Sequence, residues 1–146
     1  MSSLKINTGF LETEWTPKDP DRKAAWELYV ELLTRVATQH LEPEHGDEQS
    51  ALDSIYKLFD LTRHTLKNHE GCVEFTKIAV VVLNQVIRPF TAKWHQRSLA
   101  NAFEDTNQRL EFRTDLAALQ KKLRSFTKAL ADMAAVEDLT TSEPST

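Results

Sequence analysis

Hydrophobic residues recur every three or four positions along four segments of this chain, which is the spacing of one buried face of an α-helix. The first segment starts at Asp19 and Pro20, residue types that suit a helix start, and we expect it to end near His40 or Leu41. Residues 43–46, with a proline and a glycine, then form a turn. The residues predicted to face the core are Trp26, Tyr29, Val30, Leu33, Val36 and Ala37.

The second segment starts at Asp47, which can cap a helix, and ends at residues 67–69. Gly71 follows, and glycine readily takes the left-handed conformation that commonly ends a helix. The predicted buried stripe consists of Leu52, Ile55, Phe59, Thr62 and Leu66, with Leu58 and Leu61 beside it.

The third helix is predicted from about Val73 to Ala102. Its first part is apolar on almost every side, which indicates a central helix with neighbours on several sides. Pro89 lacks an N–H donor and clashes with the preceding turn, so it predicts a kink between Gln85 and Pro89, or a split into two helices. The apolar residues are Phe75, Ile78, Ala79, Val80, Val81, Val82, Leu83, Val86 and Ile87.

The fourth helix, which Asp105 or Thr106 caps, carries a heptad seam with alternating spacings of four and three. This pattern is typical of a helix that packs at a shallow angle on its neighbours. The seam consists of Phe112, Leu116, Leu119, Leu123, Phe126, Leu130 and Met133. Four long helices joined by short turns predict an all-α fold, an up-down-up-down four-helix bundle with a kinked third helix and an N-terminal extended arm.

The chain of 146 residues has the length of one domain. Residues 1–18 show no helical period and are assigned to the arm, and residues 19–137 form the helical bundle domain. Residues 138–146 are polar and acidic and are predicted to be a disordered tail.

The sequence contains no motif that indicates an enzyme, a cofactor site or a metal centre. With three glycines in the whole chain, a phosphate-binding loop of backbone amides is difficult to build. The pair Glu42 and His45 has the spacing of a di-iron ligand pair but lies in the turn, and Cys72 is the only cysteine. We therefore expect a non-enzymatic protein without cofactor or metal.

Charge is distributed unevenly, although the net charge of the chain is only −4. Residues 86–128 hold nine Lys and Arg against four Asp and Glu, and acidic stretches lie on both sides. The longest apolar run, residues 78–83, is far shorter than a membrane span, and the N-terminus lacks a signal-peptide pattern. The expected location is the cytoplasm, with no membrane contact.

A mixed basic and aromatic segment next to the predicted kink is the first candidate contact patch. Arginine with tryptophan is typical of protein interfaces and of surfaces on which nucleic acid bases stack. In the alternative interpretation, Phe90 and Trp94 cover the end of the core and the basic residues are solvated. The candidate partner-binding residues are Arg88, Phe90, Lys93, Trp94 and Arg97.

A basic stripe on the fourth helix is the second candidate. Its five residues fall within about 120° of each other at 100° per residue. The stripe would suit a phosphate backbone or an acidic partner, and it would equally suit the solvated face of an amphipathic helix. The residues are Arg109, Arg113, Lys121, Arg124 and Lys128.

Residues 26–35, together with Arg88, Pro89 and Phe90 and with Lys93, Trp94 and His95, resemble small uncharacterised helical modules of bacterial genomes. Some of those modules accompany conflict or antiviral defence genes. The resemblance implies a bacterial source and an adaptor or regulatory role, and it transfers no functional residue.

The predicted function is therefore that of a helical adaptor module that acts through protein–protein contacts, within a bacterial defence or regulatory complex. One alternative is a small helical subunit that binds nucleic acid inside a larger nucleoprotein complex. Another is a self-assembling protein, a homo-oligomer, in which the heptad seam pairs with a second copy.

Overall fold

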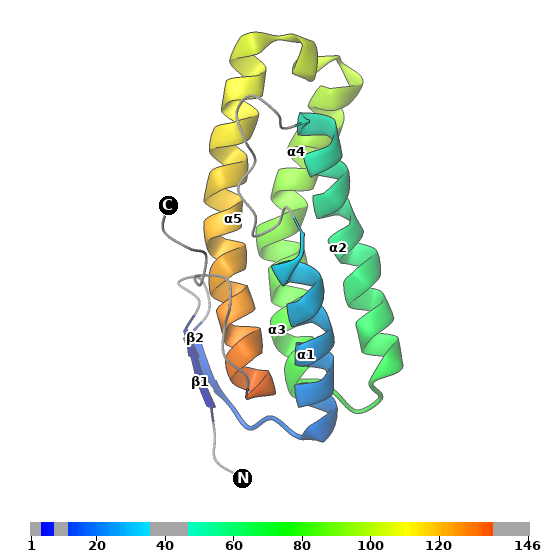
Figure 1. Ribbon diagram of the computed structural model, residues 1–146, viewed down its shortest axis with the longest axis vertical. Coiled ribbons are helices and arrows are strands. Elements are labelled where there is room, and N and C mark those ends of the chain that lie inside the picture. The colour runs from blue at the N-terminus through cyan, green and yellow to red at the C-terminus, as the bar shows by residue number, and fades with distance from the viewer. Residues whose placement is uncertain (1–3, 8–11, 36–46, 136–146) are drawn as a thin grey trace.

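The chain forms a four-helix bundle in which successive helical columns run in alternating directions (Figure 1). The computed structural model describes residues 4–7, 12–35 and 47–135, and of these it describes the side chains from residue 16 onwards. The first two columns are α1 (Asp19–Leu33) and α2 (Glu48–Asn68). The third column is α3 (Val73–Val81), η1 (Val82–Ile87) and α4 (Arg88–Leu99), and the fourth is α5 (Thr106–Ala134). The predicted all-α up-down-up-down bundle is confirmed.

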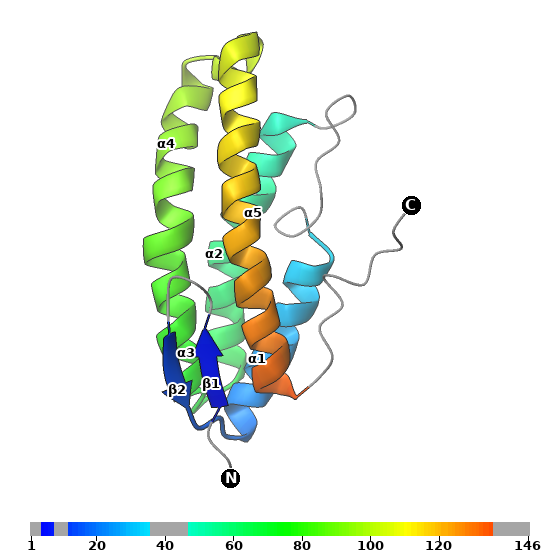
Figure 2. The ribbon, with the colours of Figure 1, turned by 90° about the vertical axis from the view of Figure 1, so that its left-hand side faces the viewer.

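The extended arm pairs with itself to form a short antiparallel hairpin. Strand β1 (Leu4–Asn7) pairs with β2 (Glu12–Trp15), and Leu4 lies opposite Trp15. Strand β1 contacts α5, so the hairpin lies along the outside of the bundle (Figure 2). The sequence pattern indicated an extended segment here but did not predict that its two halves would pair.

The third column continues past Pro89 without breaking. The six residues before α4 form a π-helix, in which the N–H of Arg88 donates to the carbonyl of Leu83, five residues earlier. Pro89 then lies in the first turn of α4, where it needs no donor. The wider π turn accommodates the proline, which explains why the helix continues. The irregularity predicted between Gln85 and Pro89 overlaps the end of this π-helical segment.

The first helix is shorter than predicted and buries a different face. It ends at Leu33, and the hydroxyl of Thr34, the C-cap residue, donates to the carbonyl of Val30. Trp26 and Val30, predicted to be in the core, are exposed. The buried face lies one position earlier and consists of Ala24, Ala25, Leu28, Tyr29 and Leu32. The predicted core residues Val36 and Ala37 lie outside the described residues.

The core runs along the inner faces of all four columns. Every residue of the heptad seam of α5 is buried against the rest of its own chain, so the seam is not available to pair with a second copy. The third column is less enclosed than predicted, because Val73 and Val80 are exposed on the outside of α3. None of the helices among the described residues combines the length and the apolar character needed to cross a membrane.

One buried carboxylate connects the starts of two helices. Asp21 is 1% exposed, and its Oδ2 accepts a hydrogen bond of 2.9 Å from the backbone N–H of Lys18 at the start of α1. Its Oδ1 accepts another of 2.9 Å from the N–H of Phe75, in the first turn of α3. The N-cap residue of α3, Cys72, makes no side-chain capping bond of its own. Asp21 therefore caps α3 from a position 54 residues away in the sequence.

We expect Asp21→Ala to lower the free energy of unfolding by about 2–4 kcal/mol, because two backbone N–H groups lose their acceptor. Urea denaturation followed by circular dichroism measures this loss. Asp19→Ala is the matched control, since Asp19 is an exposed acidic residue of the same turn, and its effect should stay below about 0.5 kcal/mol. Equal effects of the two substitutions would contradict the capping role of Asp21.

Candidate functional site

The predicted aromatic and basic patch is divided between the core and the surface. Trp94 is 0% exposed, and Phe90 is also buried. The Trp94 ring packs edge-on against Phe112, with 5.1 Å between the ring centroids, and stacks on Phe103 at 6.0 Å. Both aromatic side chains that were predicted to contact a partner therefore belong to the core between α4 and α5. The interpretation that they cover the core is the one that fits.

The basic residues of the patch pair with carboxylates of α5. Lys93 Nζ lies 2.6 Å from Asp115 Oδ2 and 2.9 Å from Glu111 Oε2. Arg97 lies 2.8 Å from the same Glu111 oxygen, and Trp94 Nε1 donates a 3.0 Å hydrogen bond to Asp115 Oδ2. The hydrogen bonds to Asp115 and Glu111 raise the pKa of Lys93, and the bond to Lys93 lowers the pKa of Glu111. These charges hold α4 to α5 and leave little positive potential for a partner.

Arg88, the remaining member of the patch, points away from this network. Its guanidinium group lies 5.0 Å above the ring of Phe59 on α2, and its Nε donates to the Asn84 side chain at 3.3 Å. The structure therefore separates Arg88 from the four residues that the sequence grouped with it.

The basic stripe of α5 is only partly a solvated surface. Arg113 forms an ion pair of 2.5 Å with Glu48 at the start of α2, and both side chains are largely covered. Arg109 donates to the hydroxyl of Thr106 on its own helix. Lys121 and Lys128 are exposed, and Arg124 is half-buried. Arg113 thus joins α5 to α2, and the stripe is not a uniform row of cations for a phosphate backbone.

The largest exposed aromatic side chain with a described environment is one that the sequence placed in the core. Trp26 is 50% exposed on α1, and Val30 lies one turn further along the same side. They belong to a shallow groove of about 600 Å³ that we call the Trp26 face. Its lining residues are Arg22, Lys23, Trp26, Glu27, Val30, Glu31, His69 and Ala134.

Hydrogen bonds between α1 and the end of α2 hold the Glu27 side chain of the Trp26 face in place. The Thr65 hydroxyl donates to Glu27 Oε2, and His69 Nε2 lies 3.4 Å from Glu27 Oε1. Partial burial alone would raise the pKa of Glu27, but the bonds from Thr65 and His69 outweigh it and hold the pKa below its usual value. The Trp26 face therefore has a rigid polar group, the carboxylate of Glu27 with its two partners, beside its exposed aromatic ring.

A second apolar hollow adjoins the Trp26 face at His69. It lies between the end of α2 and α3, and the exposed Val73 and Val80 form part of its wall. His69 lines both hollows, so the exposed apolar residues of α1 and α3 lie on either side of one side chain. Sequence reasoning missed this surface because it assigned Trp26, Val30 and Val80 to the core.

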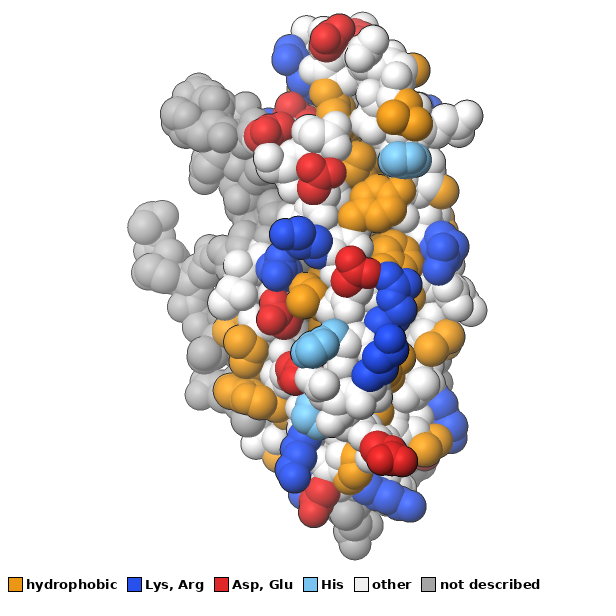
Figure 3. Space-filling view, turned by 90° about the vertical axis from the view of Figure 1, so that its right-hand side faces the viewer, with side chains coloured by type: hydrophobic (Ala, Val, Ile, Leu, Met, Phe, Trp, Pro, Cys, Tyr) orange, Lys and Arg blue, Asp and Glu red, His pale blue; other side chains and the backbone are white. Residues whose placement is uncertain are grey.

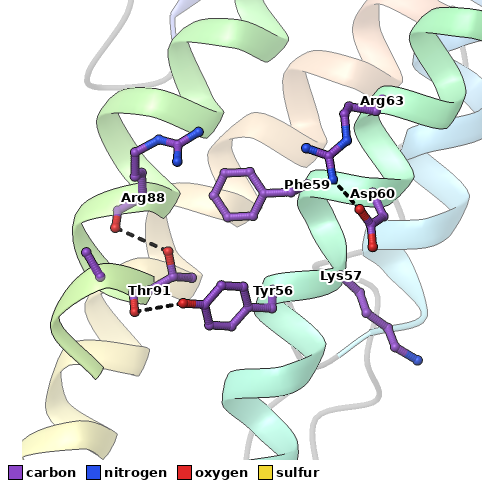
Figure 4. Close-up of a pocket in the computed structure, with 8 residues that line it drawn as sticks. Tyr56, Lys57, Phe59, Asp60, Arg63, Arg88 and Thr91 are labelled. Atoms are coloured by element: carbon purple, nitrogen blue, oxygen red, sulfur yellow. Dashed lines mark hydrogen bonds and ion pairs between the residues drawn. The ribbon is translucent and has the colours of Figure 1, made fainter. Parts of the chain in front are cut away.

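A third hollow, which we call the α2–α4 groove, is more polar. Figure 3 shows this side of the molecule, where hydrophobic side chains lie next to Lys and Arg side chains over α2. The groove has a volume of about 410 Å³, and Figure 4 shows the side chains on its two walls. Its lining residues are Tyr56, Lys57, Phe59, Asp60, Arg63, Arg88, Thr91 and Ala92.

Among the described residues, no group of three or more His, Cys, Asp and Glu side chains is placed to hold a metal ion. The Glu27–His69 pair has a threonine hydroxyl as its third member. That hydroxyl belongs to buried Thr65 and is hydrogen-bonded to the carboxylate. This arrangement orients side chains but presents no activated nucleophile to a substrate.

Comparisons of the chain with protein-family models, with curated proteins and with solved structures find no match.

The hydrogen bond that Asp115 accepts from the buried Trp94 leads to a prediction about stability. Asp115→Ala should lower the free energy of unfolding by about 1–3 kcal/mol, because the buried Trp94 Nε1–H loses its acceptor. Asp115→Asn should lose less, since the amide oxygen can still accept that hydrogen bond. Urea denaturation measures both variants, with Asp60→Ala as the control for an exposed ion pair worth less than about 1 kcal/mol. An alanine variant as stable as the wild type would refute the role of Asp115.

The lowered pKa of Glu27 predicts a dependence of stability on acid. A carboxylate whose pKa is lower in the folded state stabilises the fold above its unfolded pKa, near 4.5, and this contribution disappears as the pH falls through the folded value. Glu27→Gln should therefore lose less stability than the wild type between neutral pH and pH values below the folded pKa. Denaturation at both pH values measures the difference, and parallel acid losses in the two proteins would contradict it.

Proposed function

We propose that this chain is a non-enzymatic interaction module that binds a protein partner through the Trp26 face. The observation that carries the proposal is the exposure of Trp26, which is half accessible on a helix whose other large apolar residues are mostly buried. Tryptophan is among the residues most enriched at the energetic centres of protein interfaces, because one side chain can bury a large area.

The surroundings of Trp26 support a contact with a protein. Val30 extends the apolar area along α1, and the groove is also lined by the basic residues Arg22 and Lys23 and by the acidic residues Glu27 and Glu31. An apolar centre with charged residues of both signs at its margin is the usual composition of a protein interface. The same mixture is unfavourable for a nucleic acid backbone, which requires an excess of positive charge.

The partner that suits this face presents an apolar side chain that can pack beside the Trp26 ring, within a surface carrying charges of both signs. A role in a bacterial defence or regulatory complex and a cytoplasmic location remain predictions from the sequence, whereas the burial of the heptad seam argues against self-association through that seam.

Trp26→Ala should weaken binding of the partner by about 2 kcal/mol or more, roughly 30-fold, without unfolding the protein. A tagged pull-down from the native host, with and without nuclease and at two salt concentrations, identifies the partner, and titration of the purified partner measures affinity. Leu110→Ala is the matched control, because Leu110 is an exposed apolar residue of α5 that does not line the Trp26 face.

The Trp26 face would be supported if the Leu110 variant retains the partner and the Trp26 variant loses it, with the same result in the presence and absence of nuclease. Equal binding by both variants would exclude it. Material that disappears with nuclease and high salt would instead support the nucleic acid alternative.

A further inference from the structure

The α2–α4 groove has features of a small-molecule site that the proposed protein contact does not use. Its volume of about 410 Å³ lies within the common range for small-molecule sites. Helix α2 contributes one wall and α4 the other, and both helices are anchored in the core. The groove is therefore preformed, and a ligand would not have to order its walls.

Two arginines meet across this groove without a carboxylate between them. Figure 4 shows the guanidinium groups of Arg63 and Arg88 pointing toward one another from opposite walls, with the Phe59 ring between them. Among the described lining residues, Lys57, Arg63 and Arg88 carry positive charge and Asp60 alone carries negative charge. Two facing cations repel each other, and an anion placed between them is attracted by both.

The existing partners of the two arginines leave them able to bind an anion. Arg63 pairs with Asp60 on the same helix, and both side chains are exposed, so this pair is weak. Arg88 stacks on Phe59 and contacts the neutral side chain of Asn84. Stacking holds the planar guanidinium group in a fixed position while its outer N–H groups face the groove, an arrangement suited to phosphate oxygens.

Flat apolar surfaces lie beside these charges. The rings of Tyr56 and Phe59 have centroids 6.4 Å apart on the α2 wall. The Tyr56 hydroxyl donates to the backbone carbonyl of Thr91 at 3.4 Å, and its ring meets His95 edge-on at 5.7 Å. Tyr56 is thus held from both ends, and its ring provides a fixed surface on which a planar group can stack.

We propose that the α2–α4 groove binds a nucleoside monophosphate, with Arg63 and Arg88 holding the phosphate across the outer edge of the Phe59 ring and with the base stacked on Tyr56. The paired guanidinium groups supply the anion recognition, and the aromatic wall supplies the planar recognition. None of the residues that line the groove also lines the Trp26 face, so this site is independent of the proposed protein contact.

Calorimetric titration of the full chain with adenosine 5′-monophosphate, adenosine and inorganic phosphate tests the proposal. The monophosphate should bind at least about tenfold more tightly than either fragment, because it alone engages the cations and the rings together. Arg63→Gln and Arg88→Gln should each weaken its binding by about tenfold or more. Lys57→Gln is the control, since Lys57 lines the groove but points away from Arg88 in Figure 4.

Thermal melting of each variant confirms that it is folded, and Tyr56→Leu separates stacking from charge. Absence of saturable binding by the monophosphate would overturn the proposal, as would unchanged affinity in both arginine variants. Phosphate binding as tightly as the nucleotide would overturn the assignment of a planar ligand. If the Lys57 variant loses as much affinity as the arginine variants, binding depends on general charge attraction, and this result would also overturn the proposal.

Discussion

The arrangement of this bundle depends on one carboxylate that is removed from water and shared by two helix starts. Asp21 accepts from the backbone of its own turn and from the first turn of α3, so the starts of α1 and α3 must lie together. Gly71 makes this approach feasible, because its positive φ turns the chain sharply between α2 and α3, and its Cα faces Pro20 of α1. Burying a carboxylate is costly, and only the hydrogen bonds at both helix ends compensate for it. The alternating directions of the columns bring these two helix starts to the same end of the bundle, and the carboxylate joins them there.

Electrostatic attraction has an internal role at the other end of the bundle. The basic residues of α4 face the acidic residues of α5, and Trp94 Nε1 connects the aromatic core beneath them to one of these carboxylates, that of Asp115. Charge that looks like a binding signal in the sequence therefore contributes to the packing of α4 on α5. The surfaces that remain are of two kinds, an apolar face around Trp26 and a cationic groove at Arg63 and Arg88, and they lie on different helix pairs.

The sequence predicted the helices well where strong caps and long periods coincide. Asp47 and Asp105 cap α2 and α5 as expected, and the seam of α5 is buried throughout. The buried face of α1 was predicted wrongly. Two rows of apolar residues on this helix have helical spacing, and the row with the smaller side chains, which includes Ala24 and Ala25, is the one that packs in the core. Alanine is small enough to allow close helix contact but gives a weak hydrophobic signal. The pairing of Lys93 with Asp115, and hence the loss of the predicted patch, depends on tertiary contacts that spacing along one helix cannot reveal.

The π-helical segment before Pro89 determines how the chain tolerates changes in length. A π turn holds more residues than an α turn, so residues 82–87 contain slack that a regular helix would not have. Removing one residue there would let the column become a continuous α-helix, and the residues after it would keep nearly their present rotation about the helix axis, because a π turn holds about one residue more than an α turn. Trp94 would stay in the core, and Arg88 would stay at the groove. Removing one residue from the regular α-helical part of the same column would instead rotate every later residue by about 100°. The π segment is therefore the part of this column that can lose one residue while α4 keeps its contacts with both neighbours.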